Sequence, residues 1–222
     1  KIFTACSKDA LKKKLEEFET SQAKQEQQLI DAAQSQIAWI TGSQVCYCAQ
    51  AFAGVSREHP DSAALSVLAT VLRNGFLHTA IREKGGAYGA GASNDTATNT
   101  FKLFSYRDPK CKETFQAFED AISWAKTSIN EQHLEEAILG VVSSIDKPLS
   151  PVGEAKNDFN FNLEDINIDE RLAFRQRIIN CSIEDLVRVN KKYLTKESKR
   201  SILAGESFKD QAEELKLEIL EV

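Results

Sequence analysis

The sequence predicts an α+β domain of two layers, in which a mixed, largely antiparallel sheet packs against helices. Strand-like segments gather in the first half of the chain, and segments with helical periodicity fill most of the second half. One further strand-like segment, residues 200–205, returns after the helices. A parallel, doubly wound sheet would require strands and helices to alternate more regularly, so the sequence favours the two-layer fold.

Size and composition fit one soluble domain spanning residues 1–222. The chain has 42% hydrophobic and 27% charged residues, close to an ordinary globular protein. Its formal net charge is −5 and it has no basic block, so we expect no nucleic-acid partner. No apolar run reaches the roughly 20 residues that a membrane span needs, so no membrane partner is expected. Because the chain begins at Lys1 rather than at a methionine, we expect it to be a piece of a longer protein.

The N-terminal part of the chain reads as a short strand, a helix and a polar connection. Residues 2–7 are typical of a strand, and a capped helix is expected to follow as far as residue 19. Residues 21–44 contain seven glutamines and few apolar residues. This composition predicts an exposed, partly helical connection within the domain, with Trp39 and Ile40 as its contacts to the core.

The middle of the chain carries the strongest signals for regular structure. Residues 44–54 are rich in β-forming residues and free of proline, which predicts a strand. From residue 60 to 73, apolar side chains occur on almost every face of a helix, and such a helix is normally buried. The dipeptide Asn74-Gly75 is predicted to end it. A second short helix is then expected over residues 76–84.

The remaining elements follow from periodicity and capping signals. Helices behind Asn130 and Ser182 are predicted from the capping side chains that these two residues supply. The remaining predicted strands are residues 87–93, 100–107, 200–205 and 215–220. Besides the two capped helices, the remaining predicted helices are one marked by Phe115, Phe118 and Ile122 and two at about 153–163 and 168–180.

The cysteines predict buried free thiols in a reducing compartment, either the cytoplasm or an organelle matrix. Cys6, Cys46, Cys48, Cys111 and Cys181 form no even, closely spaced disulfide framework. Residues two apart on a strand share a face, so Cys46 and Cys48 have the spacing of half a metal site. No second pair of matching spacing occurs, and we therefore favour thiols that pack in the core.

The segment Ile81 to Gly89, with the sequence IREKGGAYG, carries the most distinctive chemistry. Arg82 is expected in the last turn of a short helix, where a cation suits the helix dipole. Gly85 and Gly86 then allow an abrupt change of direction. Tyr88 follows among very small residues, and the poor packing of such a strand suggests the close approach of another backbone. A guanidinium and a phenol together offer donors to a carbonyl oxygen or to an oxyanion.

Two other interpretations of this segment are possible. An ordinary glycine-rich turn with a surface arginine and a half-buried tyrosine fits the composition slightly better than a functional site does. A phosphate-binding loop does not fit, because neither G-x-G-x-x-G nor G-x-x-x-x-G-K-[ST] occurs. The glycines also follow a helix and precede a strand, the reverse of the order in phosphate sites.

The runs NGFLH at residues 74–78 and IREKGGAYG at residues 81–89 resemble the insulinase (pitrilysin) family of zinc metallopeptidases. The match is to the C-terminal, non-zinc domain of the presequence-protease branch. The resemblance implies a four-domain enzyme that degrades short, unstructured peptides in a closed chamber. It also implies that Arg82 and Tyr88 contact the scissile carbonyl as catalytic residues. The substrate-binding residues that it implies are His78, Gly85, Gly86, Ala87 and Gly89.

No zinc site is predicted in this chain. Its three histidines are His59, His78 and His133, and none belongs to an H-x-x-E-H motif. The nearest approach begins at His133, but Ala137 takes the place of the second histidine. Zinc is therefore expected on a different domain of the full enzyme, and this fragment alone is expected to be inactive.

The resemblance names two partners, a peptide substrate and the preceding domains of the same polypeptide. A non-catalytic structural subunit or a stand-alone peptide-binding module built on the same fold remains the alternative. A module of the second kind would bind peptide at a sheet edge.

Overall fold

A computed structural model describes residues 36–195 and 197–221 of the chain. The strand expected at residues 2–7, the helix that follows it and most of the polar connection lie outside these residues. Within them, a six-stranded sheet has the order β3-β4-β2-β5-β1-β6. The strands are β1 (Ile37–Thr41), β2 (Tyr47–Ala53), β3 (Gly89–Asp95), β4 (Thr100–Tyr106), β5 (Lys199–Gly205) and β6 (Glu218–Glu221).

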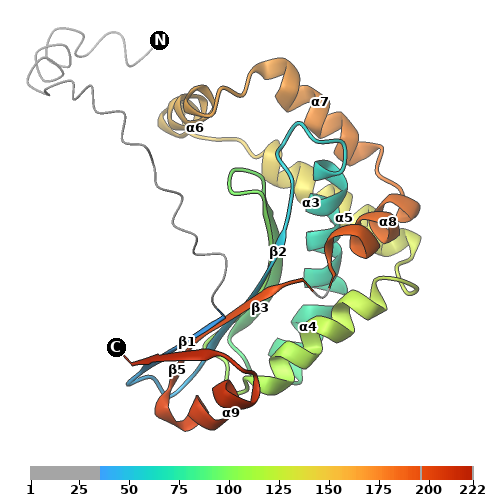
Figure 1. The fold of residues 1–222 in the computed structure, drawn as a ribbon. Helices are drawn as coiled ribbons and strands as arrows, with labels where there is room; N and C mark the ends of the chain where they lie inside the picture. The colour runs from blue at the N-terminus through green and yellow to red at the C-terminus, as the bar shows by residue number, and fades with distance from the viewer. Residues whose placement is uncertain (1–35, 196, 222) are drawn as a thin grey trace, which may run out of the picture. The chain divides into compact units, whose positions relative to one another are not determined.

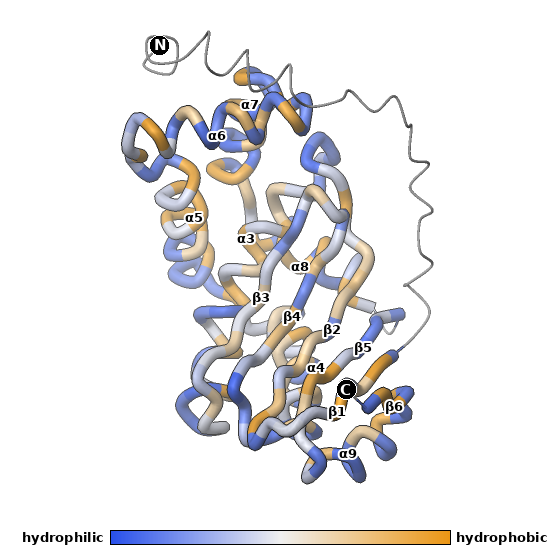
Figure 2. The backbone as a smooth tube through the Cα atoms, turned by 90° about the vertical axis from the view of Figure 1, so that its left-hand side faces the viewer, coloured by the Kyte–Doolittle hydropathy of each residue, from blue (hydrophilic) through white to orange (hydrophobic). Residues whose placement is uncertain are grey.

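The sheet is mixed, as the sequence predicts. Strands β3, β4, β2 and β5 form an antiparallel run, and β1 pairs in parallel with β5 and β6. Figure 2 shows the neighbouring strands side by side. Because three of the five pairings are antiparallel, the description of the sheet as largely antiparallel is confirmed.

Strand β1 corrects the prediction that residues 21–44 form only a polar connection. It alternates in the manner of a strand with one packed face, since Ala38 and Ile40 are buried whereas Trp39 is 39% exposed. Its partners β5 and β6 lie more than 150 residues further along the chain. A strand of five residues with polar residues on both sides has no clear local signal in the sequence. Its stability comes from pairing with strands that are distant in the chain.

Helices cover one face of the sheet (Figure 1). The helices of the sheet-bearing unit are α3 (Ser62–Leu72), η1 (Arg73–Glu83), α4 (Lys112–Trp124), α5 (Glu131–Ile145), α7 (Ile168–Ile179), α8 (Ile183–Tyr193), the short 3-10 turn η2 (Glu206–Phe208) and α9 (Lys209–Glu214). Helices α3 and η1 pack against β3, and α4 packs against β2. This arrangement is the two-layer α+β fold predicted from the sequence.

The helix expected to end at Asn74-Gly75 instead continues without a break as the π-helix η1. The wider winding is visible at its C-terminus, where Lys84 N donates to the carbonyl of Thr79 five residues earlier. Gly75 is needed for packing, because a Cβ there would lie 2.7 Å from the ring of Trp124. The contact with α4 therefore overrides the local signal for a helix end.

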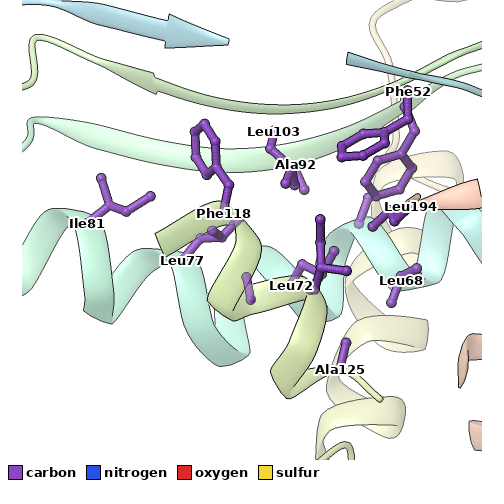
Figure 3. Packing of buried hydrophobic residues seen from close by; sticks show 14 of the residues in the cluster. Phe52, Leu68, Leu72, Leu77, Ile81, Ala92, Leu103, Phe118, Ala125 and Leu194 are labelled. Atoms are coloured by element: carbon purple, nitrogen blue, oxygen red, sulfur yellow. The ribbon is translucent and has the colours of Figure 1, made fainter. Parts of the chain in front are cut away.

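The continuous helix Ser62–Glu83 is long and apolar enough to cross a membrane by length and composition alone. Nine of the eleven residues of α3 are nevertheless buried within the domain. Figure 3 shows Leu72, Leu77 and Ile81 of this helix beneath Leu103 and Ala92 of the sheet. It is thus the central core helix of the sheet-bearing unit.

Residues 148–165 belong to a second compact unit, distinct from the one that contains the sheet. Helix α6 (Pro151–Leu163) begins with proline in its first turn, and the Ser150 side chain accepts a hydrogen bond from the Gly153 N–H. These capping features set the start of α6. That residues 1–222 act as one domain remains a prediction.

Candidate functional site

Arg82 lies in the last turn of η1, as the sequence predicts. The side chains of Leu77 and Ile81, on the same helix, are almost completely buried in the core. Arg82 itself is exposed. The core therefore fixes the backbone that carries the guanidinium, while the guanidinium faces outward.

His78 and Glu83 hold the Arg82 side chain. Arg82 Nη1 lies 3.0 Å from His78 Nε2, and His78 Nδ1 lies 3.4 Å from a carboxylate oxygen of Glu83. A guanidinium can only donate, so Nε2 must accept the hydrogen bond and Nδ1 must carry the proton that faces Glu83. The resemblance places His78 among the substrate-binding residues, and in the structure its ring links the side chains of Arg82 and Glu83.

The turn after η1 joins Arg82 to Tyr88. Gly86 has a φ of 87°, a left-handed conformation that favours glycine, and its N–H donates to the carbonyl of Arg82. The Ala87 N–H donates to the carbonyl of Ile81, and the Ala87 side chain is buried. Ala87 thus anchors the turn to the core, and only its backbone is available to a ligand.

Tyr88 stands immediately before β3 and is 62% exposed. Its N–H donates to the carbonyl of Arg107 at 3.3 Å. Its ring makes an edge contact with the ring of Tyr106, with centroids 5.4 Å apart, and the Arg107 guanidinium lies 5.7 Å from its centroid. The phenol is therefore held by two neighbours and presented to the outside.

The structure gives a reason for the small residues of β3 that was not predicted from the sequence. A Cβ at Gly89 would lie 2.2 Å from the Tyr106 ring, and one at Gly91 would lie 3.0 Å from the Phe104 ring. Aromatic side chains of β4, rather than another backbone, occupy the space. The expectation of an approaching backbone was wrong for this reason. Tyr106 and Arg107 were missed because only the register of β3 with β4 brings them to Tyr88.

We expect Gly89→Ala to destabilise the domain by about 1–3 kcal/mol, because the Tyr106 ring must move to admit the new methyl group. Urea unfolding of the two proteins measures the difference. Gly140→Ala is the matched control, since a Cβ at Gly140 in α5 meets only the Thr70 methyl group, at an ordinary 3.6 Å. Equal stability of the Gly89→Ala variant and the parent would show that the position of the Tyr106 ring does not require a glycine at residue 89.

The histidines do not form the catalytic zinc site of the family. His133 completes the capping box of α5 with Asn130, and Ala137 in the place of a second ligand is buried. His59 accepts a hydrogen bond from the Asp61 N–H, and His78 contacts Arg82. Among the described residues, the one group of three potential metal ligands contains no histidine. That catalytic zinc lies on another domain remains a prediction.

The cysteines within the described residues are all buried and free, as predicted: Cys46, Cys48, Cys111 and Cys181. Cys6 lies outside the described residues. The fold brings Cys111 to Cys46 and Cys48. Spacing in the sequence does not predict this contact, because Cys111 is separated from the pair by more than 60 residues.

Comparisons with known proteins identify the family of this chain. Residues 40–203 match the family model for the presequence protease (PreP) C-terminal domain. The chain is 39% identical to the mitochondrial presequence protease of Mus musculus over 151 residues, which are 68% of this chain and 14% of that protein. It is 36% identical to the Saccharomyces cerevisiae protein of the same name, over 73% of this chain and 16% of that one.

Solved structures share the fold. A protease from Helicobacter pylori superposes with a TM-score of 0.66 at 18% identity, over 76% of this chain and 43% of that one. Pitrilysin superposes with a TM-score of 0.54 at 14% identity, over 76% of this chain and 19% of that one. The chain spans about a sixth of the length of the curated relatives that it matches. It belongs to the presequence protease C-terminal domain family, a branch of the insulinase (pitrilysin) metallopeptidases.

Proposed function

We propose that this chain is the substrate-contacting domain of a zinc endopeptidase that degrades short, unstructured peptides in a closed chamber. In this proposal Arg82 and Tyr88 contact the scissile carbonyl, while another domain of the same polypeptide holds the zinc. The observation that carries it is the exposure of both side chains at the two ends of one turn, whose backbone is tied to the core at Ile81 and Ala87.

The two side chains suit the stabilisation of an oxyanion. The Arg82 guanidinium carries a permanent positive charge and several N–H donors, and the Tyr88 phenol carries one O–H donor. Donors that are already in place when charge develops on the substrate oxygen lower the barrier without reorganisation. The contacts of Arg82 with His78 and of Tyr88 with Tyr106 supply this preorganisation. The chain itself contributes donors and orientation, and the cleavage chemistry belongs to the metal-bearing domain.

His78 acts in this proposal as a positioning residue. Replacing it with alanine removes the acceptor that holds Arg82 Nη1. We expect His78→Ala in the complete enzyme to lower kcat about tenfold with little change in KM, consistent with one charge-assisted hydrogen bond. His78→Gln, which retains an acceptor, should recover part of the loss. Unchanged kcat in His78→Ala, or no recovery in His78→Gln, would remove this role.

The alternative is a structural or peptide-binding module on the same fold. The packing of Tyr106 over Gly89 gives the small residues a structural purpose, so their presence does not separate the two functions. Titrating a fluorescent unstructured peptide against this chain alone does separate them. We expect weak binding and no metal-dependent cleavage. Tight binding without the other domains would favour the module.

For the compartment we propose an organelle matrix. The curated relatives are named as mitochondrial proteins. The free state of the four described cysteines suits a reducing compartment of this kind. Fractionation of the source cells, with the chain followed by an antibody, tests the assignment, and recovery outside the organelle would contradict it.

A further inference from the structure

Three buried thiols meet at the junction of the sheet and α4. Cys46 precedes β2, Cys48 lies within β2, and Cys111 is the N-cap residue of α4. Their sulfur atoms all lie within 4.8 Å of one another, and those of Cys46 and Cys48 are 3.7 Å apart. None of the three residues is more than 1% exposed. We name this group the thiol cluster.

The spacing of the thiol cluster matches the dimensions of a metal-thiolate site. Zinc–sulfur bonds are about 2.3 Å long, so two thiolates on one tetrahedral ion lie about 3.8 Å apart. The separation of 3.7 Å between Cys46 and Cys48 needs almost no adjustment to reach this value. A disulfide requires a sulfur–sulfur distance of about 2.0 Å, which the cluster does not approach.

The backbone around the thiol cluster is held in place independently of the sulfurs. Cys46 and Asp108 exchange two backbone hydrogen bonds, at 2.8 and 2.9 Å. The buried Asp108 carboxylate accepts hydrogen bonds from the Lys110 N–H and from the Thr114 hydroxyl. These contacts tie the segment that carries Cys111 to the start of β2. The three sulfurs are therefore preorganised rather than gathered by chance from mobile segments.

The Cys46 sulfur lies beside more than one polar neighbour. The Cys46 sulfur faces the Cys48 sulfur and the carbonyl oxygens of Asp108 and Lys110, and one S–H can serve only one of them. Binding one cation through the three thiolates releases their three protons to the solvent.

We propose that Cys46, Cys48 and Cys111 bind one thiophilic metal cation, Zn2+ or Cu+, through three thiolates. Soft sulfur ligands select these ions over the hard cations. Cu+ is satisfied by the three sulfurs, whereas Zn2+ takes a fourth ligand. The Asp108 and Lys110 carbonyl oxygens lie beside the Cys46 sulfur, and each already accepts one hydrogen bond, so each has one lone pair left for a cation. The site is structural, because no ligand position opens to water, and it cross-links β2 to α4. It revises the expectation from the sequence that this chain binds no metal.

The test is the metal content of the 222-residue chain, purified without oxygen and reconstituted in separate arms with Zn2+ or Cu+. After removal of loosely bound ions we expect one ion per chain in at least one arm. X-ray absorption should count three sulfur ligands at about 2.3 Å. Cys111→Ser should retain less than a tenth of the metal. Cys181→Ser, which changes a buried thiol outside the cluster, should retain all of it.

Several results would overturn the site. They are a metal-free chain in both arms, fewer than three sulfur ligands, or equal loss of metal in the Cys111→Ser and Cys181→Ser variants. The sulfur count is made on the unmodified chain, so a folding defect in Cys111→Ser does not prevent the test. None of these measurements involves peptide cleavage, and the result is independent of the proposed function.

Discussion

Replacing Arg82 with alanine, or Tyr88 with phenylalanine, in the complete enzyme is expected to lower kcat by roughly a hundredfold or more. The loss of one preorganised donor to a developing oxyanion typically costs about 3–4 kcal/mol of transition-state energy. KM should change little, because these donors act on the transition state more than on the bound peptide. Steady-state kinetics on a short unstructured peptide measures both constants.

Two matched controls accompany these variants. Arg73→Ala removes another exposed arginine from the same helix η1, and Tyr47→Phe removes the hydroxyl of a tyrosine on β2 that is 36% exposed. Both controls should retain kcat within about twofold, as surface changes remote from the site do. Near-normal turnover of Arg82→Ala or Tyr88→Phe would refute the proposed roles.

Asp61→Ala is expected to cause the largest loss of stability, about 3 kcal/mol in the free energy of unfolding. The Asp61 carboxylate is buried, and it accepts hydrogen bonds from Arg188, Lys192 and Tyr193 of α8. It therefore fastens the start of α3 to α8. Removing one partner of a buried ion pair costs about 3–5 kcal/mol. The two cations are half exposed, so the expected loss lies at the low end of that range.

The pH dependence of stability tests whether the negative charge of Asp61 causes the expected loss. Burial raises the pKa of this carboxyl, but hydrogen bonds from Lys192, Tyr193 and Arg188 outweigh burial and hold the pKa below its usual range. A carboxyl whose folded pKa is depressed contributes stability above its unfolded pKa of about 3.9, and that contribution fades as the pH falls toward the folded pKa. The difference between the parent and Asp61→Asn should therefore be full at pH 7 and shrink below about pH 4.

Urea unfolding at several pH values measures both effects. Asp120→Ala, on the exposed side of α4, is the control and should change stability by no more than about 0.5 kcal/mol. A loss of similar size in Asp61→Ala, or a difference from Asp61→Asn that does not vary with pH, would contradict the account of this anchor.

Local signals in the sequence were sufficient for most helices and for the central strands. The capping boxes at Asn130 and Ser182 set the starts of α5 and α8 at the expected residues. The alternation of residues 47–53 produced β2, and the run of apolar residues before Arg73 produced the buried helix α3. These elements could be predicted because the interactions that determine them lie within a few residues of the element itself.

The failures all involve partners far apart in the sequence. The ring of Trp124 keeps the helix running through Asn74-Gly75, where local chemistry indicates an end. Strand β1 depends on pairing with β5 and β6, which lie near the other end of the chain. Tertiary packing overrides local propensity in both places.

The residues of the candidate site also fall into those predictable from the local sequence and those that depend on distant partners. The positions of Arg82 and Tyr88 around the glycine turn follow from the local sequence. The contact between His78 and Arg82 is also local, because residues four apart lie on one face of a helix. Tyr106 depends instead on the register between two strands, and Cys111 depends on the docking of α4 against β2. Neither position can be found from spacing alone.

We propose that Arg82 and Tyr88 bind the transition state of a peptide bond that another domain cuts. The most direct test is the affinity of a phosphinic peptide, which mimics the tetrahedral oxyanion, for the complete enzyme and its Tyr88→Phe variant. If the claim holds, the affinity falls about a hundredfold, in parallel with kcat/KM, while the binding of the uncleaved peptide to zinc-free enzyme is unchanged. Equal affinity of the mimic for both proteins would contradict it.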